Sequence, residues 1–394
     1  MNEYEKIPVM LVDDSSIIRA ILREVLNEDP EIDVGAYASN GRLALPRIRH
    51  YNPRVVILDY EMPEMNGLET LKAIREEHPN MAVIMFSSHT VTGAKITLQA
   101  LDIGASDFVP KPEFSGDEDP REYIRANLLP RIKALGGAGG KAGGDNGAAT
   151  NTGSPSNSAS NAETGGGPAV SGPPPAQTAG PSIAAVESAR RKRPPGSPMA
   201  LPGKFNLCAI GISTGGPPAL RELLGLLPES LNGSVVITQH MPPLFTEQLA
   251  VSLDRDSALT VHEARDGQSV KRGHVYIAPG GYHMLLQAEK DHIAVKLDES
   301  PPYQHCKPSV NLMFGSLVDL MPRKTLTVIM TGMGRDGYEG IQKLHEAGSY
   351  ILAQSRASCV VYGMPANPTE EGLASESHDV KGLAKRIIHF LGTV

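Results

Sequence analysis

Short apolar runs separated by segments of helical periodicity make up the first third of the chain. The runs are bounded by polar residues, as expected of parallel strands buried on both faces, and they cover residues 8–12, 55–58, 81–86 and 107–109. After the first run, apolar residues at positions 17, 18, 21, 22, 25 and 26 recur at helical spacing behind a candidate cap, Asp14 or Ser15. This alternation predicts an α/β fold with a doubly wound sheet.

The second half of the chain repeats the alternation of strands and helices. Central strands are predicted at 207–212, 235–238, 326–330 and 350–353. Shorter alternating stretches lie between them at 274–278, 283–287 and 293–297, with turn residues such as Pro279-Gly280-Gly281 in between. Such stretches favour antiparallel strands. We therefore expect a second α/β domain with a mostly parallel sheet and an antiparallel edge.

The segment between the two patterns has a different composition. From residue 136 to residue 182 there is no Leu, Ile, Phe, Tyr or Met, and Gly, Ala, Ser, Asn, Thr and Pro dominate. Such a segment cannot bury enough apolar surface to offset the conformational entropy of ordering it. We therefore predict a domain at 1–135, a flexible Gly/Ala/Ser/Pro-rich linker at 136–203 and a second domain at 204–394.

Composition and charge exclude several classes of partner. The net charge of -7 argues against nucleic acid, because phosphate binding needs a cationic surface. No apolar run approaches the ~18 residues of a membrane-spanning helix, and the polar start of the chain lacks a signal-peptide pattern. The cysteines, Cys208, Cys306 and Cys359, are too scattered for a disulfide framework. We expect a cytoplasmic protein with reduced thiols and no membrane insertion.

Polar groups follow each predicted strand of the first domain. Asp13 and Asp14 follow the first run, Asp59 the second, Ser87 the third and Lys111 the fourth. The strand ends of a doubly wound sheet open into one crevice, where a hard cation such as Mg²⁺ would relieve carboxylate repulsion. The lysine supplies a positive charge for an incoming anion. Two alternatives remain open: acids that only cap helices, and a phosphatase with a nucleophilic aspartate.

This pocket and its flanking motifs resemble response-regulator receiver domains from residue 7 to about residue 130. The matching motifs are Leu-Val-Asp-Asp-Ser at 11–15, Leu-Asp-Tyr-Glu-Met-Pro-Glu-Met-Asn-Gly at 58–67 and Lys111-Pro112. The resemblance implies a flavodoxin-like fold with these site residues: Asp59 as phosphoacceptor, Asp13, Asp14 and Asp59 as Mg²⁺ ligands, and Ser87, Phe108 and Lys111 as the groups that switch on phosphorylation. It also implies a cis peptide bond before Pro112.

A glycine-rich turn follows the apolar run at 207–210. Gly211-Ile212-Ser213-Thr214-Gly215-Gly216 precedes a helical pattern that opens at Pro217. Ser213 is therefore expected on a tight strand-to-helix turn, where a serine can be a nucleophile. The glycines permit the turn and leave backbone N–H groups for an oxyanion hole. The same pattern also fits a phosphate-binding nucleotide site.

Two further residues can complete a nucleophilic site. If the strands at 207, 235 and 326 are neighbours, their ends bring Ser213, His240 and Asp336 to one edge of the sheet. An imidazole can take the serine proton, and a carboxylate can fix its tautomer and stabilise the imidazolium. Taken singly, His240 is better explained as a loop histidine and Asp336 as a helix cap, and only their combination with Ser213 favours a triad. The residues alone leave both interpretations open.

The whole second half resembles the CheB family of chemotaxis protein-glutamate methylesterases and glutamine deamidases. The matching motifs are Ala-Ile-Gly-Ile-Ser-Thr-Gly-Gly at 209–216, Ile-Thr-Gln-His-Met-Pro-Pro at 237–243, Tyr-Ile-Ala-Pro-Gly at 276–280, Met-Thr-Gly-Met-Gly-Arg-Asp-Gly at 330–337 and Ala-Ser-Cys-Val-Val-Tyr-Gly-Met-Pro at 357–365. The resemblance implies Ser213 as nucleophile, His240 as general acid and base, and Asp336 as its orienting carboxylate. It places Thr214 beside the nucleophile and Met333 near the oxyanion. The glycines of the turn, Gly215 and Gly216, are also expected near the oxyanion.

Together the resemblances imply a phosphorylation-activated serine hydrolase. Its substrates would be glutamate methyl esters and certain glutamines on chemoreceptors, and a chemotaxis histidine kinase would donate the phosphoryl group. Mg²⁺ would serve the receiver, and the esterase would need no cofactor. We expect a monomer. The alternative is a receptor-binding signalling adaptor with an inactive hydrolase domain, although the intact serine, histidine and aspartate favour the enzyme.

One position departs from the CheB pattern. Where the family often has His-Arg-Pro-Ser-Val-Asp, this chain has Cys-Lys-Pro-Ser-Val-Asn at 306–311, so Cys306 stands in place of a histidine near the site. His305 precedes it, but neighbours in an extended segment point to opposite faces. The consequence expected is a change in pH response or substrate fit, with the proposed triad intact.

Overall fold

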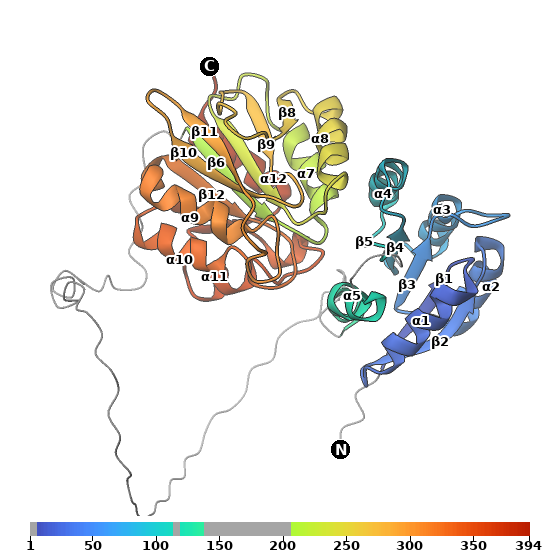
Figure 1. The fold of residues 1–394 in the computed structure, drawn as a ribbon. Coiled ribbons are helices and arrows are strands. Elements are labelled where there is room, and N and C mark those ends of the chain that lie inside the picture. The colour runs from blue at the N-terminus through green and yellow to red at the C-terminus, as the bar shows by residue number, and fades with distance from the viewer. Residues whose placement is uncertain (1–5, 113–118, 138–205) are drawn as a thin grey trace, which may run out of the picture. The chain divides into compact units, whose positions relative to one another are not determined.

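The computed structural model describes residues 6–112, 119–137 and 206–394. The predicted linker at 136–203 lies almost entirely outside the described residues, so its flexibility stays a prediction. Figure 1 shows the two folded parts of the chain. Within the described residues, no helix has the length and apolar character needed to cross a membrane.

The N-terminal part contains a five-stranded parallel sheet in the order β2-β1-β3-β4-β5. The strands are β1 (Ile7–Val12), β2 (Ile32–Ala38), β3 (Val55–Asp59), β4 (Ala82–Ser87) and β5 (Asp107–Pro110). The helices are α1 (Ser16–Asn27), α2 (Gly41–Tyr51), α3 (Gly67–Glu77), α4 (Val91–Ile103), α5 (Pro120–Asn127) and α6 (Leu129–Gly136). The strand order reverses at β1, so a crevice forms at the carboxyl ends of β1 and β3. The predicted doubly wound sheet is confirmed.

Local capping signals determine where the helices beside this crevice begin. Of the two candidate caps for α1, the serine is used, because the Ser15 side chain accepts a hydrogen bond from the N–H of Ile18. Helix α3 begins with a capping box, in which Asn66 and Glu69 each accept a 3.0 Å bond from the backbone of the other. Both caps fix the loops that leave the strand ends.

The cis peptide bond that the resemblance implied before Pro112 is wrong: Lys111–Pro112 is not cis, and the cis bond within the described residues is Lys307–Pro308.

The C-terminal part contains a seven-stranded parallel sheet in the order β14-β13-β12-β6-β7-β9-β8 and a separate antiparallel pair, β10-β11. The strands are β6 (Leu207–Ile212), β7 (Ser234–Gln239), β8 (Thr260–Glu263), β9 (His274–Ile277), β10 (His283–Ala288), β11 (Ile293–Asp298), β12 (Thr325–Ile329), β13 (Tyr350–Gln354) and β14 (Glu376–His378). As expected, β6 lies between β12 and β7. The carboxyl ends of these three parallel strands therefore meet at one edge of the sheet.

The antiparallel part of the prediction holds for two of the three stretches expected in it. β10 and β11 pair antiparallel, whereas β9 joins the large sheet and runs parallel to β7 and β8. The turn after β9 directs the chain out of this sheet. A Cβ on Gly280 would lie 2.2 Å from the carbonyl carbon of Pro242, and Gly281 has a φ of 83°, so this sharp turn depends on glycine.

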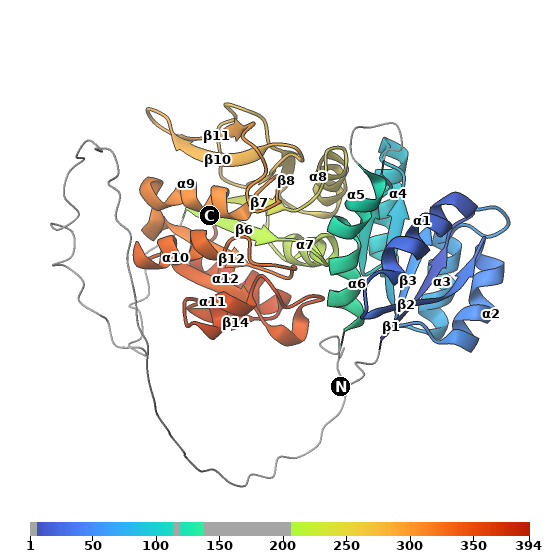
Figure 2. The same ribbon diagram turned by 60° about the horizontal axis from the view of Figure 1, so that its bottom comes forward.

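Helices cover both faces of the large sheet. They are α7 (Gly216–Gly225), α8 (Phe245–Asp256), α9 (Val310–Leu320), α10 (Tyr338–Glu346), α11 (Ala366–Glu370) and α12 (Val380–Leu391). Helices α9 and α10 lie on one face and α7 and α12 on the other (Figure 2). On the first face, Phe314 of α9 and Ile341 of α10 pack in one buried cluster with Tyr276 of β9 and Met284 of β10. This packing holds the loop before α9 at the carboxyl edge of the sheet.

Glu376 links strand β14 to β13 and α12 through hydrogen bonds and an ion pair. Its carboxylate accepts from Arg386 Nε at 2.7 Å and lies 2.7 Å from His378 Nε2. Arg386 Nη2 and the Tyr350 hydroxyl also donate to it. Burial alone would raise the pKa of Glu376, but these donors lower it to about 2. The carboxylate is therefore ionised over the whole neutral range.

Candidate active site and phosphoacceptor pocket

Ser213 lies on the turn between β6 and α7, where the sequence places it. Its N–H donates to the carbonyl of Thr331 at 2.9 Å, which ties the turn to the segment after β12. Gly215 has a φ of 77°, a conformation that residues with side chains rarely adopt. A Cβ on Gly332 would lie 2.8 Å from the Cβ of Ser213. Glycine is therefore required on two sides of the serine.

The backbone donors of this turn fall into two groups. The N–H of Gly216 donates to the Ser213 carbonyl at 2.8 Å, so this N–H is engaged within the turn. Within the described residues, the N–H groups of Thr214 and Gly215 make no such bond. The loop after β12 that carries Met333 is held to the turn, because Thr331 Oγ1 donates to the Thr214 carbonyl at 2.9 Å.

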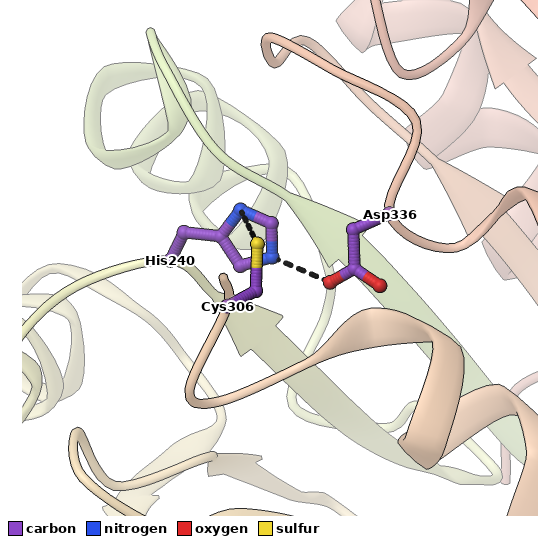
Figure 3. A group of neighbouring side chains, drawn as sticks. All are labelled: His240, Cys306 and Asp336. Carbon is purple, nitrogen blue, oxygen red and sulfur yellow. Dashed lines mark hydrogen bonds and ion pairs between the residues drawn. The ribbon is translucent and has the colours of Figure 1, made fainter. Parts of the chain in front are cut away.

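His240 follows β7 and is held beside the serine turn. Its N–H donates to the Ile212 carbonyl at 3.2 Å, and its Nε2 lies 2.7 Å from Asp336 Oδ2 (Figure 3). This bond leaves Nδ1 as the nitrogen able to exchange a proton with another group. Ser213 Oγ makes no hydrogen bond to His240 within the described residues. Such bonds are often long before substrate binds.

Asp336 is the most heavily hydrogen-bonded side chain of the site. Its Oδ1 accepts from Ser309 Oγ and from the N–H groups of Asn311 and Gly337, at 2.9, 2.9 and 3.0 Å, and its Oδ2 accepts from the N–H of Val310 at 2.6 Å. Burial would raise the pKa of Asp336, but the bonds from His240, Asn311 and Val310 lower it. The carboxylate therefore stays ionised at the N-terminus of α9, where the helix dipole favours negative charge.

The imidazole of His240 responds to these neighbours. Burial would lower its pKa, but the hydrogen bonds to Asp336 and Cys306 outweigh burial and raise the pKa to about 10. Near neutral pH the resting imidazole is therefore mostly protonated. The fraction of neutral His240, the form that can accept a proton, increases as the pH rises.

Cys306 lies against the imidazole; the sequence placed it near the site but did not predict this contact. Its Sγ is 4.0 Å from His240 Nδ1 (Figure 3). The segment is a tight turn, because Tyr303 and Cys306 exchange backbone bonds of 3.0 and 2.9 Å and the φ angles of Gln304 and His305 are 48° and 66°. The assumption of an extended segment at His305 is therefore wrong. The signal available in the sequence was the departure from the family pattern at Cys306.

Gln239 is a second residue that sequence reasoning missed. Its Nε2 donates to the Ser213 carbonyl at 3.0 Å, and a Cβ on Gly216 would lie 1.8 Å from its Oε1. The side chain thus supports the serine turn from β7. An amide at the end of a strand predicted to be buried was the available signal, since buried polar groups need partners.

In the N-terminal part, Lys111 bridges two strand-end carboxylates. Its Nζ lies 2.9 Å from Asp13 Oδ2 and 2.8 Å from Asp59 Oδ2. The Lys111 N–H donates to the Ser87 carbonyl at 2.7 Å. Burial would lower the pKa of Lys111, but the two carboxylates raise it, so the ammonium stays charged. The structure brings these four predicted residues together at the ends of β1, β3, β4 and β5.

The carboxylates of this pocket fit a hard cation. Asp13, Asp14 and Asp59 each offer an oxygen within 4.8 Å of the other two. Within the described residues, the buried Oδ2 atoms of Asp13 and Asp59 are paired with the ammonium of Lys111 and with no other donor. Burial raises the pKa of Asp59 to about 6, against the lowering effect of Lys111. Mg²⁺ binds through carboxylate oxygens and waters, so the donor set suits it.

Two of the three expected switch residues, Ser87 and Phe108, lie on the adjacent strands β4 and β5. Ser87 Oγ is 2.7 Å from Thr97 Oγ1 of α4, so its hydroxyl is engaged with the helix. Phe108 of β5 is in register with Met85 of β4. A change in the Ser87 hydroxyl can therefore reach both α4 and the strand that carries Phe108.

Comparison with known proteins follows the division into two parts. The CheB methylesterase family matches residues 208–387, and the response regulator receiver domain family matches residues 9–118. A solved structure, the Thermotoga maritima CheB methylesterase catalytic domain, is 39% identical and covers 48% of this chain and 99% of that chain, with a TM-score of 0.46.

Curated relatives match the chain over nearly its full length. A protein-glutamate methylesterase/protein-glutamine glutaminase of Trichodesmium erythraeum is 37% identical over 98% of this chain and 99% of its own. A second relative, protein-glutamate methylesterase/protein-glutamine glutaminase 1 of Oleidesulfovibrio alaskensis, is 38% identical over 97% of this chain and 99% of its own. Because the likeness spans almost all of both chains, this chain belongs to the protein-glutamate methylesterase/protein-glutamine glutaminase family.

Proposed function

We propose that the chain is a cytoplasmic, phosphorylation-activated serine hydrolase that demethylates glutamate methyl esters, and deamidates certain glutamines, on chemoreceptors. The observation that carries the proposal is the 2.7 Å bond between His240 Nε2 and Asp336 Oδ2 at the strand edge that also holds the Ser213 turn. A buried carboxylate that orients an imidazole beside a serine on a strand-to-helix turn is the arrangement of acyl-transfer hydrolases.

The proposed reaction proceeds through an acyl-enzyme. Ser213 Oγ attacks the side-chain carbonyl of the substrate, and neutral His240 takes the serine proton at Nδ1, because Nε2 is committed to Asp336. The N–H groups of Thr214 and Gly215 stabilise the oxyanion. His240 returns the proton to the leaving methanol or ammonia. Water then repeats the sequence on the acyl-enzyme and yields glutamate.

Control is proposed to start at Asp59. A phosphoryl group there would compete with Asp13 and Asp59 for the ammonium of Lys111, which now contacts both carboxylates. Mg²⁺, held by Asp13, Asp14 and Asp59, would supply charge neutralisation for the transferred group. Because the Lys111 N–H is bonded to the Ser87 carbonyl, movement of the lysine is transmitted to β4. A histidine kinase is the proposed phosphodonor.

Labelling with a fluorophosphonate probe tests the hydrolase assignment without a receptor. The probe forms a covalent bond with an activated serine, and peptide mass spectrometry identifies the residue. We expect labelling at Ser213 that is lost in Ser213→Ala and greatly slowed in His240→Gln. Absence of labelling in the folded wild-type chain would favour the alternative, a receptor-binding adaptor with an inactive hydrolase part.

A further inference from the structure

Three side chains from distant segments converge in a group that we call the His–Cys–Asp cluster: His240, Cys306 and Asp336. His240 follows β7, Cys306 lies between β11 and α9, and Asp336 lies between β12 and α10. Each offers one possible ligand atom, and these atoms all lie within 4.8 Å of one another. Figure 3 shows the thiol and the carboxylate directed at the same imidazole ring.

We propose that the His–Cys–Asp cluster binds a divalent transition-metal ion of the Zn²⁺ type and that the bound ion inhibits the hydrolase. The metal site is independent of the proposed function, and only the inhibition rests on it. Thiolate sulfur, imidazole nitrogen and carboxylate oxygen are the three ligand types of protein zinc sites. Three protein ligands leave a fourth position open for water.

The observed spacings are close to those of a zinc site. With Zn–N and Zn–O bonds of ~2.0–2.1 Å and a Zn–S bond of ~2.3 Å, tetrahedral geometry separates the ligand atoms by ~3.3–3.6 Å. The imidazole and carboxylate atoms, now 2.7 Å apart, would open by roughly half an ångström. The Cys306 sulfur faces Nδ1 at 4.0 Å and lies within 4.8 Å of a carboxylate oxygen of Asp336, so it would move toward the Nε2 side of the ring to bind the same ion.

The backbone around the cluster already holds two of its members in place. Asp336 is fixed by bonds from Ser309, Asn311 and Gly337 to Oδ1, which keep Oδ2 directed at the imidazole. Cys306 is presented by the tight turn that its two backbone bonds to Tyr303 close. Such hydrogen bonds to the ligand residues orient metal ligands and strengthen metal binding. Asp336 and Cys306 therefore need little further ordering when the ion binds.

Binding and inhibition follow from one exchange of protons. The ion takes the place of the proton shared by His240 Nε2 and Asp336 Oδ2, and both this proton and the proton of the Cys306 thiol pass to solvent as the metal bonds form. The metal-bound imidazole is then neither oriented by Asp336 nor able to cycle a proton with Ser213. No electron is transferred, so a chelator reverses the inhibition.

The thiol gives the His–Cys–Asp cluster a different metal preference from the carboxylate pocket of the receiver part. Mg²⁺ prefers oxygen ligands, whereas a thiolate selects softer ions. Excess Mg²⁺ would be drawn to the carboxylate oxygens of Asp13, Asp14 and Asp59, which lie within 4.8 Å of one another, without competing for the cluster. A titration in saturating Mg²⁺ isolates the proposed site.

The test is a Co²⁺ titration of the reduced full-length chain in saturating Mg²⁺. Co²⁺ stands in for Zn²⁺ because its thiolate bond gives a near-ultraviolet charge-transfer band. We expect one equivalent of Co²⁺ to produce this band and one of Zn²⁺ to remove it. Cys306→Ser should abolish the band, whereas the matched control Cys359→Ser, which alters the other partly exposed cysteine, should retain it.

A zinc competition assay gives the affinities of the same variants. Loss of an outer-shell partner costs ~10–100-fold in metal affinity, so loss of the Cys306 ligand should weaken Zn²⁺ binding by at least ~10-fold. His240→Gln should weaken it comparably, and thermal melting verifies that each variant is folded. A band unchanged in Cys306→Ser, or equal Zn²⁺ affinity in Cys306→Ser and the wild type, overturns the site.

Inhibition is scored separately from binding. Each variant is labelled by the fluorophosphonate probe with Zn²⁺ and after chelation, relative to its own metal-free rate. We expect Zn²⁺ to suppress labelling of the wild type and of Cys359→Ser far more than that of Cys306→Ser. Zn²⁺ binding with full labelling overturns the inhibition. Zn²⁺ binding in a chain that never reacts with the probe contradicts the proposed function and leaves the metal site standing.

Discussion

Replacement of Asp336 by asparagine tests whether one carboxylate serves both the chemistry and the fold. Its two oxygens accept four hydrogen bonds from the segment that opens α9 and from Gly337, in addition to facing His240. Asparagine keeps one acceptor oxygen and places an amide where Oδ2 stood. That amide nitrogen then faces the N–H of Val310, which was bonded at 2.6 Å.

The stability cost can be worked from these contacts. A buried donor left without a partner costs ~1–3 kcal/mol, and loss of the negative charge at the N-terminus of α9 costs a further ~0.3–1 kcal/mol. We expect the free energy of unfolding to fall by about 2–4 kcal/mol. The midpoint of thermal unfolding of the C-terminal part should fall by roughly 5–15 °C.

The catalytic cost arises from the tautomer. Beside an amide N–H₂, His240 Nε2 becomes the acceptor and Nδ1 carries the proton, so Nδ1 cannot take the proton of Ser213. An Asp-to-Asn change of this kind lowers kcat by ~10⁴-fold in a serine protease, and we expect a similar loss here. Urea unfolding and the rate of fluorophosphonate labelling measure the two effects. Ser213→Ala is the matched control, which should lose labelling with little change in stability.

Two outcomes would refute this reasoning about Asp336. If Asp336→Asn were as stable as the wild type, the bonds to the start of α9 would not contribute as the geometry indicates. If its labelling rate fell by less than about tenfold, tautomer control of His240 by this carboxylate would be wrong.

Three further predictions concern other parts of the chain. Gly332→Ala should abolish labelling of Ser213, because its Cβ would lie 2.8 Å from the serine Cβ; labelling at the wild-type rate would show that the turn tolerates the methyl group. Gly67→Ala should impair phosphorylation of Asp59 by acetyl phosphate, because its Cβ would lie 2.3 Å from the Asp59 carbonyl oxygen; ³²P incorporation equal to wild type would contradict this. Glu376→Gln should remove a stabilisation of about 2–3 kcal/mol that is fully present above pH 4.5 and lost as the pH falls toward the folded-state pKa of about 2. Urea unfolding at pH 6 and pH 3 measures it, and a difference between variant and wild type that is the same at both pH values would be inconsistent with that pKa.

Much of the fold follows from apolar runs, because strands buried on both faces have no polar positions to obscure them. β3 and β4 are of this kind and were predicted within a residue or two. β2 was not predicted, because it lies at the sheet edge and alternates buried with exposed residues around Gly35. The direction of β9 was also out of reach, since local alternation does not encode which strand becomes its neighbour.

The candidate site was predictable where residues sit directly at strand ends. Ser213 and His240 follow β6 and β7, whose adjacency is enough to bring them together. The contact of Cys306 with His240 depends on how a long connection closes into a turn, which no periodicity reports. Which imidazole nitrogen faces Asp336 is likewise set by packing around α9.

Methanol release from methylated chemoreceptor membranes, with and without acetyl phosphate and Mg²⁺, tests the central claim most directly. We predict that the phosphodonor stimulates release by the full chain, that Ser213→Ala releases none, and that Asp59→Asn keeps a basal rate without stimulation. Release that persists in Ser213→Ala, or no release by the folded wild type under either condition, would contradict a phosphorylation-activated methylesterase built on these residues.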